Sequence, residues 1–232
     1  MSTTRSAQPI AARRSPLSRS RIVEAAVGLA DDSGSAGVTM RAVASSLGVE
    51  AMSLYNHVAN RAGLLDGMID AVFAEIALPD SAAPWRDELH VLAVSTRAAL
   101  QRHPWAIGMM DSRSTPGPAT LRHHDSVLGT LRRAGFSTTM SVHAMAVLDS
   151  YVYGSLLQER SLPFGENGDA DDAGDAGHAA AELLAQLSAA DYPNLAEIAL
   201  ERAGAGSAAP GVDDEFLFGL ALILDGLAPD AG

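Results

Sequence analysis

The chain has 232 residues, of which 47% are hydrophobic, and a formal net charge of -12 at neutral pH. It is long enough to bury the core of one large domain or two small ones, but no apolar run approaches the roughly 18 residues that a membrane span needs. Cysteine is absent, which excludes disulfides and cysteine-ligated metals, and no secretory signal opens the sequence. We therefore expect a cytoplasmic protein without a membrane partner.

The N-terminal segment predicts a disordered arm followed by a helix. Residues 1–17 mix Ser, Thr, Pro and Arg without hydrophobic periodicity, which is typical of a disordered basic arm. From Ser20, the apolar residues Ile22, Ala26 and Leu29 recur at helical spacing, and this pattern predicts an amphipathic helix that ends near Ser33.

Residues 39–58 predict two short helices joined by a tight turn. Thr39 can cap the first helix, and Gly48 can adopt the left-handed conformation that ends it. The second helix begins near residue 50 or 51 and turns Leu54 and Val58 inward, so one outer face is largely polar. The residues left to the outer faces are Met52, Ser53, Tyr55, Asn56 and His57. This arrangement is the helix-turn-helix geometry that places a second helix in the major groove of DNA.

Polar side chains on and around this second helix are the predicted DNA contacts. Asn and Arg side chains can pair bidentately with base edges, while Tyr and Ser hydroxyls more often hold phosphate. Arg61 begins a helix, where a cation is electrostatically misplaced, so it is a phosphate candidate. The full set is Thr39, Arg41, Ser53, Tyr55, Asn56, His57 and Arg61. A solvated surface face is the alternative for this set.

The distribution of charge agrees with a DNA-binding N-terminal module. Residues 1–63 carry seven arginines against four acidic residues, a net +3, whereas the remainder carries nine arginines against 24 acidic residues, a net -15. Neutralising phosphates is what supplies sequence-independent affinity for DNA. The asymmetry therefore predicts a module that faces a polyanion and an acidic body that lies away from it.

The rest of the chain predicts further helices. Asn60 can cap a helix over 61–78 that ends before Pro79. Helical patterns follow over 85–102, 105–110, 116–135, 137–158, 179–187, 194–202 and 213–227, and the acidic, Gly-rich stretch 165–177 predicts a mobile loop. Because no strand-like alternation is found, we expect an all-α protein with a basic arm (1–17), a helix-turn-helix DNA-binding domain (18–63) and an effector-binding and dimerisation domain (64–232).

Residues 20–70 resemble the DNA-binding domain of the TetR family of transcriptional repressors. They share with it the first amphipathic helix, the Thr-capped second helix, the Gly-Val turn, the Leu-Tyr-x-His-Val run and the Asn-Arg start of the next helix. Residues 97–104, 135–137 and 216–227 are similar to helices of the regulatory domain of the tetracycline-repressor branch. The resemblance implies operator DNA and a small-molecule effector as partners, and a homodimer that pairs the helices at about 138–160 and 213–228.

The chain departs from that branch where the drug would bind. Tetracycline-responsive members surround the drug with polar groups, including a metal-coordinating His, whereas Leu92, Thr96 and Met110 occupy such positions here and residues 64–84 contain no His. We therefore expect a more apolar effector. Aromatic residues and methionines suit an adaptable apolar pocket, although core packing is the alternative for each of them. The candidates are Trp105, Met109, Met110, Phe136, His143, Met145 and Tyr151.

No metal or cofactor site is expected. His123, His124 and Asp125 have the composition of a metal site, but adjacent histidines point to different faces of a helix, which disfavours a shared ion. The other histidines show no pairing at helical spacing.

These observations favour a ligand-responsive transcriptional regulator, a repressor that binds a palindromic operator as a dimer and that a small effector releases. One alternative is a constitutive DNA-binding protein without an effector. The other is an all-α enzyme, suggested by the histidines and by the Asp87-Glu88 pair, but no Ser-His-Asp, metal-binding or phosphate-loop signature supports it. We expect that the protein is not an enzyme.

Overall fold

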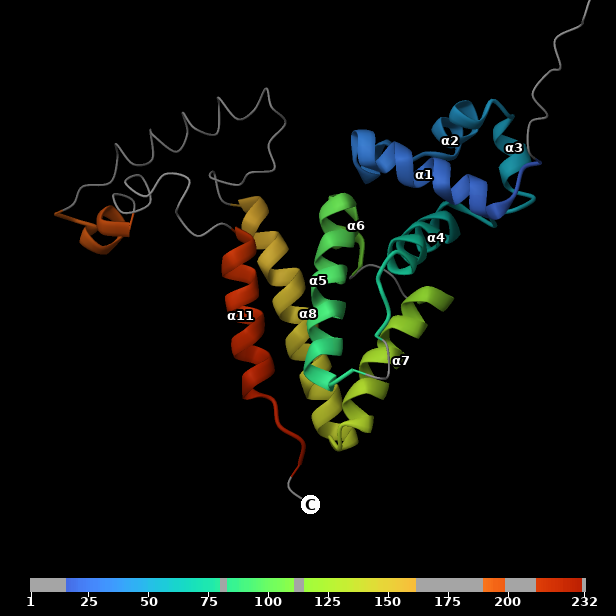
Figure 1. Ribbon diagram of the computed structural model, residues 1–232. Coiled ribbons are helices and arrows are strands. Elements are labelled where there is room, and N and C mark those ends of the chain that lie inside the picture. The colour runs from blue at the N-terminus through green and yellow to red at the C-terminus, as the bar shows by residue number, and fades with distance from the viewer. Residues whose placement is uncertain (1–15, 80–82, 111–114, 162–189, 199–211, 231–232) are drawn as a thin grey trace, which may run out of the picture. The chain divides into compact units, whose positions relative to one another are not determined.

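The computed structural model describes residues 16–79, 83–110, 115–161, 190–198 and 212–230 (Figure 1). All regular structure in these ranges is helical, so the all-α prediction is confirmed. The chain divides into two compact units, Met1–Met68 and Ile69–Gly232. The predicted loop over 165–177 and the helix over 179–187 lie outside the described residues, as does nearly all of the predicted arm.

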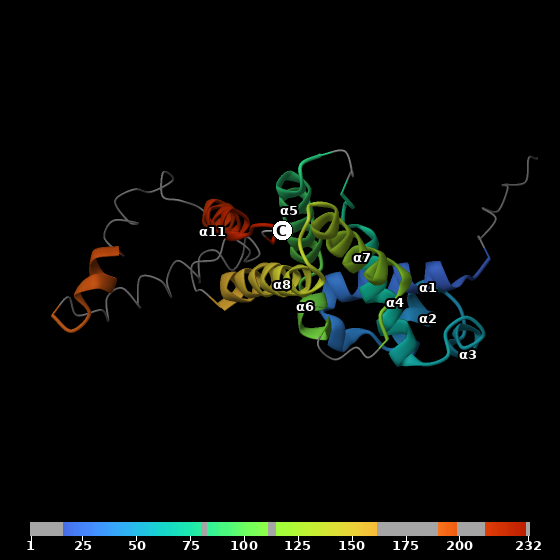
Figure 2. The ribbon, with the colours of Figure 1, turned by 90° about the horizontal axis from the view of Figure 1, so that it is seen from below.

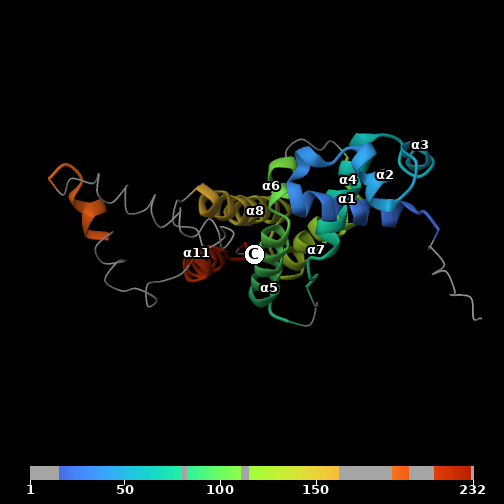
Figure 3. The same cartoon turned by 90° about the horizontal axis from the view of Figure 1, so that it is seen from above.

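The first unit is built from short helices around one core. It contains α1 (Arg19–Ser33), a 3-10 turn η1 (Ser35–Gly37), α2 (Met40–Leu47), α3 (Ala51–Leu54) and the start of α4 (Arg61–Ala74). Figure 3 shows α2 lying between α1 and α3, and it packs against both of them. The fully or nearly fully buried side chains come from every α-helix of the unit: Ile22, Ala26, Ala30, Val43, Ala44, Leu54, Leu64 and Met68.

The helices α1 and α4 approach each other closely at Gly67. A Cβ atom built on this glycine would lie 2.9 Å from Cγ2 of Val23 on α1. A larger residue at position 67 would therefore force the two helices apart, and the glycine fixes the start of α4 against α1.

The N-terminus of α4 agrees with the prediction, but its C-terminus does not. Oδ1 of Asn60 accepts a hydrogen bond from the Gly63 N–H at 2.8 Å, as expected of a cap. The predicted helix over 61–78 was too long, because α4 ends at Ala74. The N–H groups of Glu75 and Ile76 bond to carbonyls three residues back, and the Glu75 carboxylate binds Arg102 and His103. These contacts with α5 draw the chain out of the helix.

The second unit is a helical bundle. It contains α5 (Trp85–Arg102), α6 (Pro104–Met110), α7 (Pro118–Arg133), α8 (Thr138–Ser161) and α11 (Val212–Gly226). Residues 193–198 are also helical. Seen from below, α8 runs past α5 and α7, and α11 lies along its other side (Figure 2). None of the described helices is both long and apolar enough to cross a membrane.

The side chain of Asp70 joins α4 to the start of α7. Its Oδ1 accepts hydrogen bonds from the N–H groups of Ala119 and Thr120, at 2.8 and 2.9 Å, and from the Thr120 hydroxyl at 3.2 Å. A helix N-terminus has unpaired N–H groups and a positive end, both of which a carboxylate satisfies. A Cβ atom on Gly117 would lie 2.3 Å from Cγ of Asp70, so this position leaves no room for a side chain.

Candidate DNA-binding and ligand-binding sites

The helix-turn-helix of the first unit has the predicted local geometry. Oγ1 of Thr39 accepts a hydrogen bond from the Ala42 N–H at 3.1 Å, which caps α2. Gly48 ends α2 with a left-handed φ of 65°, and the Val49 N–H then bonds to the Ala44 carbonyl oxygen at 3.0 Å. These bonds turn the chain sharply and set the direction of α3.

The second helix of the motif is shorter than expected. Regular helix ends at Leu54, and residues 55–57 form turns. Both His57 and Val58 donate their N–H groups to the Leu54 carbonyl oxygen, at 2.9 Å each, so the chain stays tightly coiled after the helix. Leu54 and Val58 are buried as predicted. The predicted contact residues at 55–57 therefore lie on a turn that follows α3.

Most of the predicted DNA contacts are exposed. Thr39, Arg41, Asn56 and His57 are exposed, Ser53 is half-buried, and Tyr55 has an exposed fraction of 44%. Met52, which was not among the predicted contacts, is 73% exposed. An apolar side chain on this face can pack against the methyl group of thymine. The exposure of a large apolar side chain is the signal that adds Met52 to the set.

Arg61 has partners within the protein. Its Nε donates to the Val38 carbonyl oxygen at 3.0 Å, and one terminal nitrogen lies 3.5 Å from the carbonyl oxygen of Ser35. The guanidinium therefore ties the start of α4 to the segment that precedes α2. Arg61 keeps an exposed surface, so this structural role is compatible with a phosphate contact.

The second unit contains a cavity of about 420 Å³ between α8 and α11. Hydroxyls, carboxylates, an amide and two aromatic rings share its wall. The lining residues are Ser150, Tyr151, Gly154, Ser155, Gln158, Glu159, Glu215 and Phe216. Of the predicted pocket residues, only Tyr151 belongs to this wall.

Tyr151 fixes the crossing of the two helices at the cavity. Its hydroxyl donates to the Phe216 carbonyl oxygen at 2.9 Å, and its ring stacks on that of Phe216 at a centroid distance of 5.4 Å. A Cβ atom on Gly219 would lie 2.1 Å from the Tyr151 hydroxyl, so the tyrosine packs directly against the α11 backbone. Burial raises the pKa of Tyr151, which keeps the hydroxyl protonated as a donor.

The other predicted pocket residues are dispersed over the second unit. Trp105 and Met109 are buried on α6, and Met110 at its end is half-buried. Phe136 is buried with its ring edge-on to that of Trp85, at a centroid distance of 5.1 Å. On α8, Met145 is half-buried and His143 is exposed. The structure does not bring these six residues to the cavity that Tyr151 lines.

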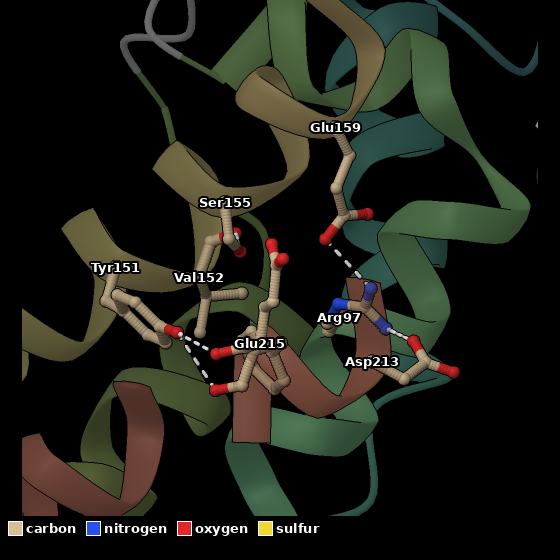
Figure 4. A network of polar contacts seen from close by, with 8 residues as sticks. Arg97, Tyr151, Val152, Ser155, Glu159, Asp213 and Glu215 are labelled. Atoms are coloured by element: carbon tan, nitrogen blue, oxygen red, sulfur yellow. Dashed lines mark hydrogen bonds and ion pairs between the residues drawn. The ribbon is translucent and has the colours of Figure 1, made fainter. Parts of the chain in front are cut away.

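An ion-pair network centred on the buried Arg97 joins α5, α8 and α11 beside the cavity (Figure 4). Arg97, whose side chain is only 7% exposed, donates to Oε1 of Glu159 at 2.8 Å and forms a second ion pair with Asp213. Its guanidinium carbon also lies 4.8 Å from the centroid of the Phe216 ring. No local pattern could reveal these pairs, since the partners of Arg97 are 62 and 116 residues away.

The two adjacent histidines of α7 pack against the ring of Phe73. His123 is buried, its ring edge lies against Phe73, and its Nδ1 has no hydrogen-bond partner. Burial, with a smaller contribution from the charge of His124, lowers the pKa of His123 from 6.5 to about 4. Within the described part of the chain, no group of three or more His, Cys, Asp or Glu side chains is placed to hold a metal ion.

Glu88, half of the acidic pair that suggested an enzyme, also has a structural role. It is buried and accepts hydrogen bonds from the Thr130 hydroxyl at 2.6 Å and from Arg133 at 3.1 Å. Asp87 beside it is exposed. The pair therefore points in two directions, and Glu88 holds α5 against α7.

Two family models match the chain. Residues 22–68 match the bacterial regulatory proteins of the tetR family, and residues 78–230 match the tetracyclin repressor-like C-terminal domain. An HTH-type transcriptional regulator of Saccharopolyspora erythraea is 36% identical over 181 residues, which make up 78% of this chain and 74% of the relative. The HTH-type transcriptional repressor DrrR1 of Streptomyces coeruleorubidus is 33% identical over 214 residues, or 91% of this chain and 77% of the relative.

A solved structure has the same fold. It is the crystal structure of the Streptomyces coelicolor TetR family protein ActR in complex with actinorhodin, which matches with a TM-score of 0.73 and 27% identity and covers 91% of this chain and 95% of that chain. The family models match helices of both compact units. The chain belongs to the TetR family of transcriptional regulators, with an N-terminal helix-turn-helix domain and a helical C-terminal domain.

Proposed function

We propose that this protein is a ligand-responsive repressor that binds a palindromic operator as a homodimer and leaves it when a small effector binds. The observation that carries the proposal is the capped helix-turn-helix with its exposed polar face, in a chain whose second unit matches the regulatory domain of the same family. Repression is the activity of the similar protein DrrR1, and a bound small molecule is present in the similar protein ActR.

The DNA-binding surface consists of the predicted contacts around α3. Arg41 and Asn56 read base edges, since both side chains can form bidentate hydrogen bonds with them. Thr39, Ser53, Tyr55, His57 and Arg61 position the motif on the DNA backbone. Met52 adds an apolar contact.

The homodimer pairs α8 and α11 with the same helices of a second copy. Support comes from exposed apolar side chains on both helices, which a monomer would leave in water. On α8 they are Val142, Val147 and Leu157, and on α11 they are Leu217, Phe218 and Leu222. Two helices from each copy form a four-helix interface with twofold symmetry. Such a dimer presents two α3 helices to successive major grooves, about 34 Å apart.

The effector acts by changing the distance between the two α3 helices of the dimer. Contacts for its body are drawn from among the predicted pocket residues, which the structure disperses over the second unit instead of gathering around one cavity: Trp105, Met109, Met110, Phe136, His143, Met145 and Tyr151. Because α4 begins in the first unit and ends in the second, it carries the change between them. A ligand that favours the conformation with the wrong spacing weakens operator binding by roughly 1 to 3 kcal/mol of coupling free energy.

Selection from random DNA tests the proposal. The full-length protein is incubated with a random duplex library, and bound sequences are recovered and sequenced. We expect enrichment of a palindrome whose half-sites lie about one helical turn, or a multiple of it, apart, bound by a dimer in analytical ultracentrifugation. Enrichment of a single unrepeated half-site, or no enrichment, would contradict the proposal.

A further inference from the structure

We propose that Met52 recognises a thymine in each half-site of the operator, by packing its side chain against the C5-methyl group of that base in the major groove. The inference rests on the proposed DNA binding around α3 and deepens it, because it assigns one base and one chemical group to one side chain. The hydrogen bonds expected of Arg41 and Asn56 do not cover this kind of readout.

Met52 is exposed at a position where DNA is the expected partner. Its exposed fraction is 73%, and no other large hydrophobic side chain in the described ranges is as exposed. A single exposed apolar side chain is common on protein surfaces, so it is the position on α3 of the helix-turn-helix that gives this exposure a meaning. A surface that covers the side chain removes it from water and gains free energy.

Hydrogen bonds fix the backbone around Met52 and direct its side chain outward. The Ser53 N–H bonds to the Glu50 carbonyl oxygen at 2.9 Å, and the Tyr55 N–H bonds to the Met52 carbonyl oxygen at 3.3 Å. Leu54, two residues further on, is fully buried. Because successive residues of a helix are about 100° apart, a residue two positions from Leu54 points to nearly the opposite side, away from the core.

The position of Met52 within α3 suits contact with a base. It is the second residue of the helix Ala51–Leu54. In a helix-turn-helix, the N-terminal residues of the second helix are the ones that reach base edges in the major groove. The side chain of Met52 is therefore directed to base edges.

The chemistry of the methionine side chain selects thymine. Thymine alone among the four bases presents a C5-methyl group in the major groove, where the other bases present mainly hydrogen-bonding atoms. A thioether donates no hydrogen bond and accepts only weakly, so it desolvates those atoms without replacing their bonds to water. The unbranched, flexible side chain can instead adapt its shape to a methyl group.

Two other roles for the side chain predict different results. Contact with deoxyribose does not depend on any methyl group of a base. Insertion between stacked bases is a minor-groove device that kinks DNA, whereas the second helix of a helix-turn-helix lies in the major groove.

Replacement of thymine by uracil in the selected operator tests the inference, because it removes only the C5-methyl group and keeps the base pair. Operators with single replacements are titrated against the full-length protein by fluorescence anisotropy. We expect at least one thymine position at which uracil lowers affinity about fourfold in one half-site and about fifteenfold in both, the value of burying one methyl group at each. No such position, or a selected half-site without thymine, would overturn the proposal.

Variants of Met52 show whether this side chain reads the methyl group. Met52→Gln keeps the length of the side chain but makes it polar, so its affinities for the thymine and uracil operators should become equal at the sensitive position. Met52→Leu keeps an apolar side chain and should still prefer thymine. Thermal melts confirm that each variant is folded. A methyl effect of unchanged size in Met52→Gln would show that another side chain reads thymine, and it would overturn the proposal.

Methylation of cytosine gives the converse measurement. Operators that carry cytosine or 5-methylcytosine at the sensitive position differ only in the C5-methyl group. The wild-type protein should bind the methylated operator about fourfold more tightly for each half-site, and Met52→Gln should not distinguish the two. Equal affinities of the wild type for both operators would overturn the proposal.

The control is an exposed apolar residue of the second unit. Leu121 of α7 is 55% exposed, and Leu121→Ala should keep the full preference for thymine over uracil. Loss of the preference in this variant would show that the methyl effect does not report a contact of Met52. Failure to select any operator contradicts the proposed repressor as well, whereas an operator bound without dependence on methyl groups contradicts only the assignment of Met52.

Discussion

At the residue scale, Asn56 and Arg61 illustrate two different relations to DNA. Asn56 is exposed on the turn after α3. Arg61 donates to the Val38 carbonyl oxygen at 3.0 Å. Base reading by Asn56 is therefore a proposal that rests on its exposure, whereas Arg61 supports the motif through its internal hydrogen bond and is also exposed.

Changing Asn56 should alter base preference. An amide that forms a bidentate pair with adenine contributes about 1 to 3 kcal/mol of discrimination at that position. We expect Asn56→Ala to bind the selected operator more weakly and to discriminate less between bases at one base pair of each half-site. Competition with single-base operator variants measures both effects. Equal weakening on all of these operators would show that Asn56 does not read a base.

Changing Arg61 should weaken binding on every sequence. We expect Arg61→Ala to reduce affinity and to lower the slope of log affinity against log salt by about one unit, since one phosphate contact is lost. Arg61→Lys is the matched control, because it keeps the charge but not the planar guanidinium that reaches the Val38 carbonyl. If the slope is unchanged in Arg61→Ala, the residue acts only through its internal hydrogen bonds.

The buried His123 should make stability depend on pH. Its pKa is about 4 in the folded protein against 6.5 for an ordinary histidine. The free energy of unfolding is therefore unaffected by His123 above pH 6.5 and falls as the pH is lowered towards 4. In that window the unfolded chain takes up a proton on His123, whereas the folded protein does not. The loss amounts to about 3 kcal/mol.

Urea unfolding between pH 4 and pH 7 measures this effect. His123→Leu should flatten the pH dependence over the window, whereas His143→Leu, at an exposed position of α8, should keep it. The account of His123 is wrong if both variants follow the wild-type curve.

At the element scale, tertiary contacts decide where helices begin and end. Hydrophobic periodicity predicted both ends of α5 at the correct residue, because the pattern is local and Pro104 follows the helix closely. It overestimated α4 because Glu75 leaves the helix to bind Arg102 and His103. A partner 27 or 28 residues away leaves no trace in a local pattern.

The contact between Asp70 and α7 gives a prediction at this scale. Asp70 satisfies the N–H groups of Ala119 and Thr120 that no residue of α7 could satisfy. Removing a capping carboxylate destabilises a protein by about 0.5 to 2 kcal/mol. We expect Asp70→Ala to lower the free energy of unfolding by this amount in urea titrations. Asp125→Ala, at an exposed position on α7, is the control and should change little.

At the scale of the whole molecule, sequence reasoning predicted the family, the helical fold and the DNA-binding motif, because all three depend on local signals such as the Thr39 cap and the Gly48 turn. The environment of the ligand site depends on long-range packing instead. Arg97 meets Glu159 and Asp213 only after α5, α8 and α11 assemble. Of the predicted pocket residues, Tyr151 alone lines the cavity beside that network.

The charge of the whole chain also fits a repressor that must leave DNA. Residues 16–63 contain four arginines and four acidic residues, so their charges cancel. The net +3 of residues 1–63 therefore comes from Arg5, Arg13 and Arg14. The remainder of the chain carries -15. Electrostatic attraction to phosphate is therefore modest, and a coupling of a few kcal/mol from an effector is enough to change occupancy of the operator.

The most direct test of ligand-responsive repression is the affinity of the full-length protein for its selected operator, measured by fluorescence anisotropy with and without small molecules. The panel includes actinorhodin, the ligand in the crystal structure of the similar protein ActR. The account predicts that at least one compound weakens operator binding by a factor of about 5 to 150, the range of typical coupling free energies. Identical operator affinity with every compound that the protein binds would contradict it.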